Sequence, residues 1–174
     1  MSGRYSEEFG ELTKHAERLL KCPDVDLPHH RELLRLWRFP SFAEYESWLV
    51  YTPVARYANV DSPCVVKVSW DRPFDYARFH DPMKGLVHGL ALEPAIKLRR
   101  SEVSEPELQS RLAGLELINL RLLMHKSITL DGEQFGLESF GEPAVRITWQ
   151  SAVPEPWRPL AEWAGGMRRF LDSL

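Results

Sequence analysis

The chain has 174 residues, a length that can bury a real core in one domain without disulfides or metals. Apolar residues make up 44% and charged residues 27%, and the net charge is −3. This balance has neither the basic excess of a nucleic-acid-binding protein nor the acidic block of a disordered tail. The two cysteines, Cys22 and Cys64, form no disulfide framework or metal motif. We expect a cytoplasmic protein, because no signal peptide or membrane-spanning apolar run is recognisable.

The first predicted helix covers residues 6–21. Its apolar residues recur at the three- and four-residue spacing of one helical face, and Pro23 ends it. Acidic side chains lead the segment and basic ones trail, which complements the helix dipole. The apolar residues are Phe9, Leu12, Ala16, Leu19 and Leu20.

Two further helices are predicted before residue 60. In "HHRELLRLWRF", residues 29–39, Leu33, Leu36 and Trp37 follow helical spacing. In "SFAEYESWL", residues 41–49, Ser41 and Glu44 have the spacing of a capping box. The sequence therefore predicts a helical part over residues 1–60.

From residue 62 the apolar period changes to two. Residues 64–70 alternate as a half-buried strand, and residues 94–103 supply a second one. Between them, residues 71–93 have weak periodicity and many turn formers, so we expect a long irregular connection that holds at most one helical turn. Ser104 and Glu107 form another capping box, and Leu108, Leu112 and Leu115 follow it as a helix.

A β-meander is predicted over residues 128–150. Asp131-Gly132 is a strong hairpin signal that would place Ile128 opposite Phe135. The next apolar residues share a face with Phe135 only if the following loop has an odd number of residues. A three-residue loop over 140–142 meets this condition and pairs Leu137 with Val145 and Phe135 with Ile147.

The last segment predicts an amphipathic helix that covers the dry face of the meander. Leu160, Trp163, Ala164, Met167, Phe170 and Leu171 form its apolar side, and Glu162, Arg168, Arg169 and Asp172 would face water. Gly165-Gly166 in mid-helix is explained by close approach to the sheet or by a kink, and we favour close approach. The fold class is thus α+β: N-terminal helices, an antiparallel meander of four to five strands and a C-terminal helix, within one domain over 1–174, of which 61–174 holds the sheet and later helices.

The densest polar group lies in the 71–93 connection. Carboxylates and imidazoles are ligands for divalent metals, and a loop could gather them. The same residue types also form turns, so solvated turn residues are the alternative reading, and it is the one we favour. The residues are Asp71, Asp75, His80, Asp81 and His88. No catalytic motif, phosphate-binding loop or cofactor signature accompanies them.

Trp157 and Arg158 lie in "PEPWRP", at the entrance to the last helix. A proline-framed aromatic residue beside an arginine has the composition of an interaction anchor. It could equally be a staple that folds onto the sheet and fixes the direction in which the helix begins. We favour the staple.

The segments "LDGEQFGLES" and "AVRITWQSAVPEPWRPLAEWAGGMRRFL" resemble the C-terminal part of a group of small, uncharacterised bacterial cytosolic proteins. Members of that group carry a similar hairpin, a strand ending in Trp and a "P-x-x-W-x-P-L" helix. The resemblance extends upstream through "VSWDRPFDYARFHDPMKGLVHGLALEPAIKLR" and covers about residues 63–172. It implies a bacterial origin and an α+β fold, and it assigns no activity. Some similar proteins look like immunity partners of secreted toxins.

Two functions follow as hypotheses. The first is a non-enzymatic protein-interaction module, of the kind an immunity-type inhibitor represents, that contacts another protein through residues 71–93 and the Trp157 region. Its expected contacts are Asp75, His80, Asp81, His88, Trp157 and Arg158. The second is a metal- or ligand-binding protein, or a hydrolase-like enzyme, that uses the Asp- and His-rich connection. No cofactor, nucleic acid or membrane is expected, and the oligomeric state stays open.

Overall fold

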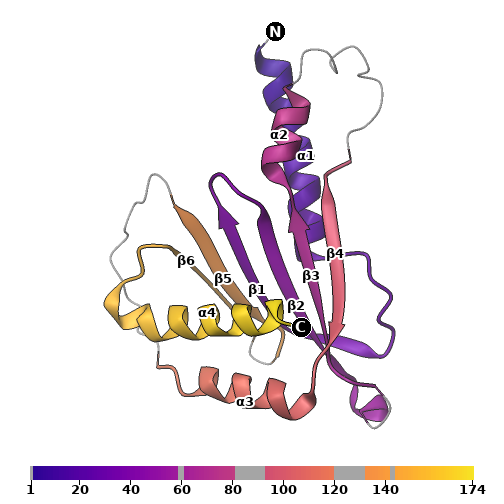
Figure 1. The fold of residues 1–174 in the computed structure, drawn as a ribbon, viewed down its shortest axis with the longest axis vertical. Helices are drawn as coiled ribbons and strands as arrows, with labels where there is room; N and C mark the ends of the chain where they lie inside the picture. The colour runs from indigo at the N-terminus through magenta and orange to yellow at the C-terminus, as the bar shows by residue number, and fades with distance from the viewer. Residues whose placement is uncertain (1, 59–60, 81–92, 120–131, 142–143) are drawn as a thin grey trace.

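The computed structural model describes residues 2–58, 61–80, 93–119, 132–141 and 144–174. These residues form four α-helices and a six-stranded antiparallel sheet with strand order β4-β3-β2-β1-β5-β6 (Figure 1). The strands are β1 (His30–Pro40), β2 (Tyr45–Pro53), β3 (Cys64–Trp70), β4 (Ile96–Glu102), β5 (Glu133–Ser139) and β6 (Val145–Gln150). The helices are α1 (Ser2–Lys21), α2 (Arg72–Phe79), α3 (Glu105–Glu116) and α4 (Arg158–Asp172), with 3-10 turns η1 (Ala55–Tyr57) and η3 (Glu155–Trp157). The α+β class is confirmed, with six strands where four to five were predicted.

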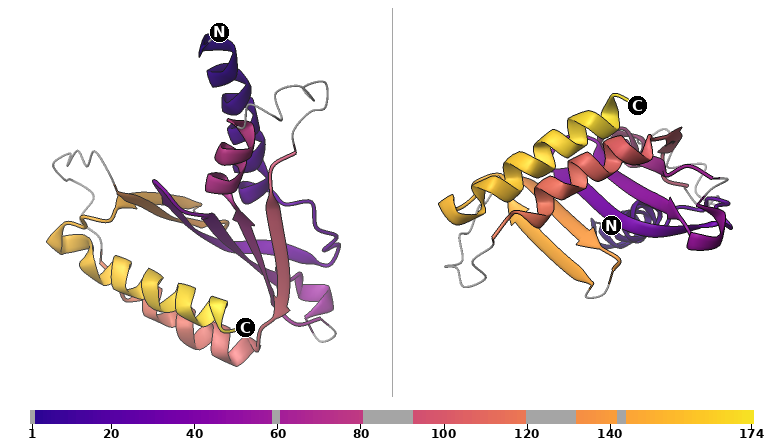
Figure 2. Two further views of the ribbon diagram at one scale, coloured as in Figure 1. Left: turned by 45° about the horizontal axis from the view of Figure 1, so that its top comes forward. Right: turned by 90° about the horizontal axis from the view of Figure 1, so that it is seen from below.

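Helices cover both faces of the sheet. α3 and α4 lie side by side across one face, and α1 lies against the other (Figures 1 and 2). The α4 face holds a core around Leu36, Trp48 and Leu137, and the α1 face holds a second core around Leu49, Val66 and Trp70. The sheet is therefore the middle layer of the molecule, with an apolar cluster on each side of it.

The two helices predicted over residues 29–39 and 41–49 are wrong, because these segments form β1 and β2. Leu36 faces α4 while its neighbour Trp37 faces the opposite side, and both are buried. In β2, residues 47–51 are all buried. A strand that is covered on both faces loses the alternation of apolar and polar residues, and its sequence then imitates a buried helix. The predicted helical part over residues 1–60 accordingly shrinks to α1.

The helices predicted at the two ends of the chain and after Ser104 are confirmed. α1 buries Leu12, Ala16 and Leu20, as its spacing predicts. The predicted capping boxes are not formed: the Ser104 side chain makes no cap hydrogen bond, and the Ser41 hydroxyl donates to the carbonyl of Gly132. The segment predicted to be an irregular connection begins with α2, which contains two turns of helix. Residues 81–92 lie outside the described residues.

The β5–β6 hairpin confirms the predicted parity and corrects the register. Phe135 pairs with Trp149, Leu137 with Ile147 and Ser139 with Val145. Ile147 and Trp149 thus share a face with Phe135 and Leu137, but the loop is five residues long, over 140–144, instead of three. The predicted partner strand over 128–130 lies outside the described residues, and the two neighbours of β5 in the described sheet are β1 and β6.

α4 covers one face of the sheet as predicted, but one residue of its predicted polar side is not exposed. Leu160, Ala164, Met167 and Leu171 are buried, but Arg168 is half-buried instead of facing water. Close approach does not explain Gly165-Gly166. A Cβ atom at Gly165 would meet only Nη1 of Arg169, at 3.6 Å, and one at Gly166 only Nη2 of the same side chain, at 3.9 Å. No described atom of the sheet lies within 4 Å of either Cβ position.

Candidate functional site

Asp75, which the sequence singles out as a metal ligand or partner contact, is fully buried. Its Oδ2 accepts hydrogen bonds from the Trp70 indole N–H at 2.8 Å and from the Ala95 backbone N–H at 2.7 Å. Its Oδ1 lies 2.7 Å from a guanidinium nitrogen of Arg78. This carboxylate joins the end of β3, α2 and the start of β4, so its contacts are those of a structural residue.

The other predicted ligands do not assemble around Asp75. Asp71 caps α2, because its Oδ1 accepts the backbone N–H of Phe74 at 3.0 Å. His80 ends the same helix, exposed, with Nδ1 2.8 Å from the carbonyl of Tyr76. Within the described parts of the chain, no three His, Cys, Asp or Glu side chains come together as a metal-binding group. Asp81 and His88 lie outside the described residues.

Trp157 lies in η3 and packs, half-buried, against the core on the α4 face. Arg158 begins α4 and forms an ion pair with Glu155, and both of these side chains are largely exposed. Burial of the indole at the start of α4 favours the staple over the interaction anchor. The Pro-framed segment thus fixes the position of α4 over the sheet.

An apolar groove lies between α2 and the turn that joins β1 to β2, and we call it the α2 groove. Its volume is about 410 Å³. Phe42 is 83% exposed and Tyr76 is 51% exposed, although both are large apolar side chains. The lining residues are Ser41, Phe42, Arg72, Pro73 and Tyr76.

Two side chains of the α2 groove, Tyr76 and Arg72, are held by contacts with neighbouring residues. The Tyr76 ring stacks on His80 with centroids 4.1 Å apart, and Phe9 of α1 meets it edge-on at 5.5 Å. Arg72 donates from Nη1 to the carbonyl of Ser41 at 3.0 Å, while its buried Nε has no hydrogen-bond partner in the described structure. The groove therefore presents the packed ring of Tyr76 and the largely exposed ring of Phe42 beside the Arg72 cation.

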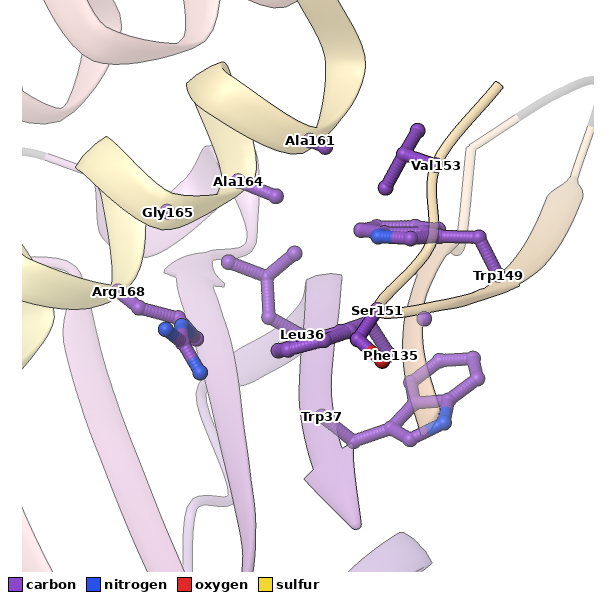
Figure 3. A pocket seen from close by; sticks show the side chains of 11 residues that line it. Leu36, Trp37, Phe135, Trp149, Ser151, Val153, Ala161, Ala164, Gly165 and Arg168 are labelled. Carbon is purple, nitrogen blue, oxygen red and sulfur yellow. The ribbon is translucent and has the colours of Figure 1, made fainter. Parts of the chain in front are cut away.

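A second hollow, the α4 cavity, lies between α4 and strands β1, β5 and β6 (Figure 3). Its volume is about 240 Å³. Ala161, Ala164 and Gly165 line it from the helix, and their small size leaves the space open. On the sheet side Figure 3 shows Leu36, Phe135 and Trp149 around the hollow, with Arg168 at one side. The cavity is apolar except for this guanidinium and Ser151.

The carboxylates near Arg168 are engaged by other cations. Glu46 forms ion pairs with Lys67 at 2.8 Å and with Arg38 at 3.3 Å. Asp172 accepts from Lys67 at 2.7 Å and from the indole of Trp48 at 2.9 Å, and Glu133 pairs with Arg38. Among the described residues, no carboxylate forms an ion pair with Arg168. Its guanidinium carbon lies 5.3 Å from the ring centroid of Phe135 and 5.7 Å from that of Trp48.

Electrostatics make the position of Arg168 costly. Burial lowers the pKa of its guanidinium, and the nearby charge of Arg38 lowers it further, against the opposing effect of Glu46, Glu133 and Asp172. Cation–π contact with two rings replaces part of the lost hydration. The cation lies at the edge of an apolar hollow, without an ion-pair partner among the described residues.

Buried Arg35 on the α1 face is balanced differently. One of its guanidinium nitrogens lies 2.7 Å from a carboxylate oxygen of Glu138 in β5. Burial lowers the pKa of Arg35, and the charge of Glu138 opposes that effect. The guanidinium groups of Arg35 and Arg146 also lie over the Trp37 ring, at 4.6 and 5.4 Å from its centroid. The ion pair joins β1 to β5, and Arg146 and Glu32 also act on the charge of Arg35, in opposite directions.

Comparison with protein-family models, with curated proteins and with solved structures finds no match for this chain. The resemblance to small bacterial proteins therefore stays a prediction. No helix in the described parts of the chain combines the length and apolarity needed to cross a membrane. The α2 groove and the α4 cavity were both missed by sequence reasoning. Their residues come from segments that are distant in the sequence. The sequence of an amphipathic helix also gives no signal that the carboxylates near Arg168 form ion pairs with other cations.

Proposed function

We propose that the protein is a non-enzymatic protein-interaction module that binds its partner through the α2 groove. The observation that carries this proposal is the exposure of Phe42, an aromatic side chain that is 83% accessible beside Tyr76 and Arg72. Rigid aromatic side chains next to an arginine are enriched among the residues that dominate binding energy at protein interfaces. α2 also belongs to the connection that the sequence favours as a contact surface.

The chemistry of the groove supports a partner of one kind. A segment with an apolar side chain would fill the space between Phe42 and Tyr76. A neighbouring carboxylate would lie close to the positive charge of Arg72, which lines the groove. The expected partner is a protein that presents an apolar residue followed by an acidic one on an exposed loop or terminus. An immunity-type inhibitor is one protein of this class.

The metal or hydrolase alternative receives no support from the described residues. Asp75 is committed to Trp70, Ala95 and Arg78, and its burial removes it from any ligand at the surface. Asp71 and His80 cap the two ends of α2. We therefore keep binding to a protein partner as the proposed function.

A photo-crosslinking amino acid at position 42 tests the proposal in the native host. The matched control places it at Leu117, an equally exposed apolar residue that follows α3. We expect one protein to be captured from position 42 and not from 117. The purified partner should then bind wild type and Leu117→Ser alike, and Phe42→Ser and Tyr76→Ser at least tenfold more weakly. Equal binding by all four proteins, or no stoichiometric partner, would overturn the proposal.

A further inference from the structure

The α4 cavity is independent of the α2 groove, and it combines features that point to a ligand. Arg168 is half-buried, and among the described residues no carboxylate pairs with it, because Glu46 and Asp172 are bound to Lys67. A half-buried cation that no carboxylate pairs with can form a charge-assisted hydrogen bond with a ligand carboxylate. The guanidinium therefore favours a negatively charged ligand.

The remainder of the lining identifies the body of the ligand. Leu36, Phe135, Trp149 and Val153 present apolar surface, and the Trp149 ring faces the hollow in Figure 3. Binding sites for small molecules typically combine such an apolar lining with a few polar groups that fix orientation. In this cavity the guanidinium stands at one side, so a bound molecule would need its charge at one end.

The volume limits the size of that molecule. A dry cavity of about 150 Å³ is known to admit benzene. The α4 cavity, at about 240 Å³, has room for one ring, or an alkyl chain of similar bulk, and a short charged substituent. A nucleotide or a long fatty acid is too large.

We propose that the α4 cavity binds a small monocarboxylate with one ring-sized apolar body, its carboxylate paired with Arg168. This inference goes beyond the proposed protein-binding function and does not depend on it. It also gives Gly165 a role: this residue lines the cavity from α4, and the lack of a side chain there leaves room on the helix side of the hollow.

The direct test uses phenylacetate and its neutral analogue phenylacetamide, titrated into the full-length protein by calorimetry. Methyl NMR signals of Leu36 and Val153 report where the probe binds. We expect saturable one-site binding of phenylacetate that shifts both signals, and at least tenfold weaker binding of the amide, because charge-assisted hydrogen bonds are lost. Arg168→Met should reduce phenylacetate affinity to that of the amide. Arg169→Met, the matched change at an exposed neighbour, should bind like wild type.

A pair of glycine variants separates loss of the cavity from loss of the fold. Gly165→Leu and Gly166→Leu both replace glycine in the middle of α4, and only Gly165 lines the cavity. Each should leave the protein at least as stable as wild type, since leucine favours a helix over glycine. Gly165→Leu should abolish binding and Gly166→Leu should preserve it.

Three outcomes would overturn the inference. One is the absence of saturable binding by phenylacetate, indole-3-acetate and hexanoate. Another is equal affinity for the acid and the amide in wild type. The third is unchanged binding in a folded Gly165→Leu variant. Shifts of the Leu36 and Val153 signals on dilution, with no effect of the probes, would instead assign the cavity to contact with a second copy of the chain.

Discussion

Replacement of Gly136 by alanine should destabilise the protein strongly, although alanine normally suits a strand better than glycine does. Gly136 of β5 pairs with Trp37 of β1, and a Cβ atom at this position would overlap the six-membered ring of the indole. The ring cannot simply retreat. It is 3% exposed, and the guanidinium groups of Arg35 and Arg146 lie over it.

The magnitude follows from what must move. Overpacking typically costs about 1–3 kcal/mol, and complete loss of a buried tryptophan side chain costs about 3–5 kcal/mol. Because the overlap is with a rigid ring held between two strands, we expect about 3 kcal/mol for Gly136→Ala. For a chain of this length, that corresponds to a fall in Tm of about 6–12 °C.

Urea unfolding of wild type, Gly136→Ala, Trp37→Leu and the double variant measures the effect as a cycle. The double variant should lose much less stability than the sum of the two single variants, since leucine at position 37 makes room for the added methyl group. Gly10→Ala is the control: its Cβ would lie in open space on α1, and it should gain about 1 kcal/mol. A Gly136→Ala protein as stable as wild type would refute the reasoning.

Three further predictions concern buried groups. Asp75→Ala should lower the free energy of unfolding by about 3–5 kcal/mol, because it leaves Arg78 and two N–H donors without their acceptor. A change of less than about 1 kcal/mol in thermal denaturation would contradict this. In the native protein, a thiol reagent should modify Cys22, which is exposed, and spare Cys64, whose pKa burial raises; equal labelling rates by mass spectrometry would count against it. Burial also raises the pKa of Glu32, with Arg35 opposing, so the folded state binds this proton more tightly than the unfolded state. The stabilisation is complete below the unfolded-state pKa and is lost as pH rises through the folded-state pKa, so Glu32→Gln should be more stable than wild type at neutral pH, with a flatter profile in urea titrations from pH 4 to 7.

Sequence patterns predicted the elements that have one dry face. α1 and α4 each bury one stripe, and β6 keeps strict alternation, so their periods survive in the sequence. β1 and β2 were misread because they lie in the middle of the sheet with apolar residues on both sides. β3 was predicted as half-buried and is also buried on both faces, but Lys67 and Ser69 gave its sequence a strand-like alternation. The loop between β5 and β6 has an odd number of residues, as predicted, but it is longer than predicted. The odd number follows from the face of the sheet that the apolar residues of both strands share, whereas the length depends on turn chemistry.

The candidate sites were harder to predict for a different reason. Asp75 resembles a ligand in the sequence, and only its three partners, from β3, from α2 and from the residue before β4, identify it as structural. Arg168 is the converse case. It was assigned to the wet side of α4, and the engagement of Glu46 and Asp172 by Lys67 is what leaves it without an ion-pair partner among the described residues. Both roles depend on contacts between segments far apart in the chain.

The strand order carries a consequence for how the molecule assembles. β1 to β4 pair as neighbours in chain order, as do β5 and β6, whereas the β1–β5 ladder joins residues 34–40 to residues 133–139. Each run can form from local contacts, but the ladder between them must close a loop of nearly a hundred residues, with its entropic cost. Trp37 with Gly136 and Arg35 with Glu138 both lie on this ladder. We expect docking of the two runs to limit the folding rate, and these two pairs to act as the recognition elements that register one run against the other.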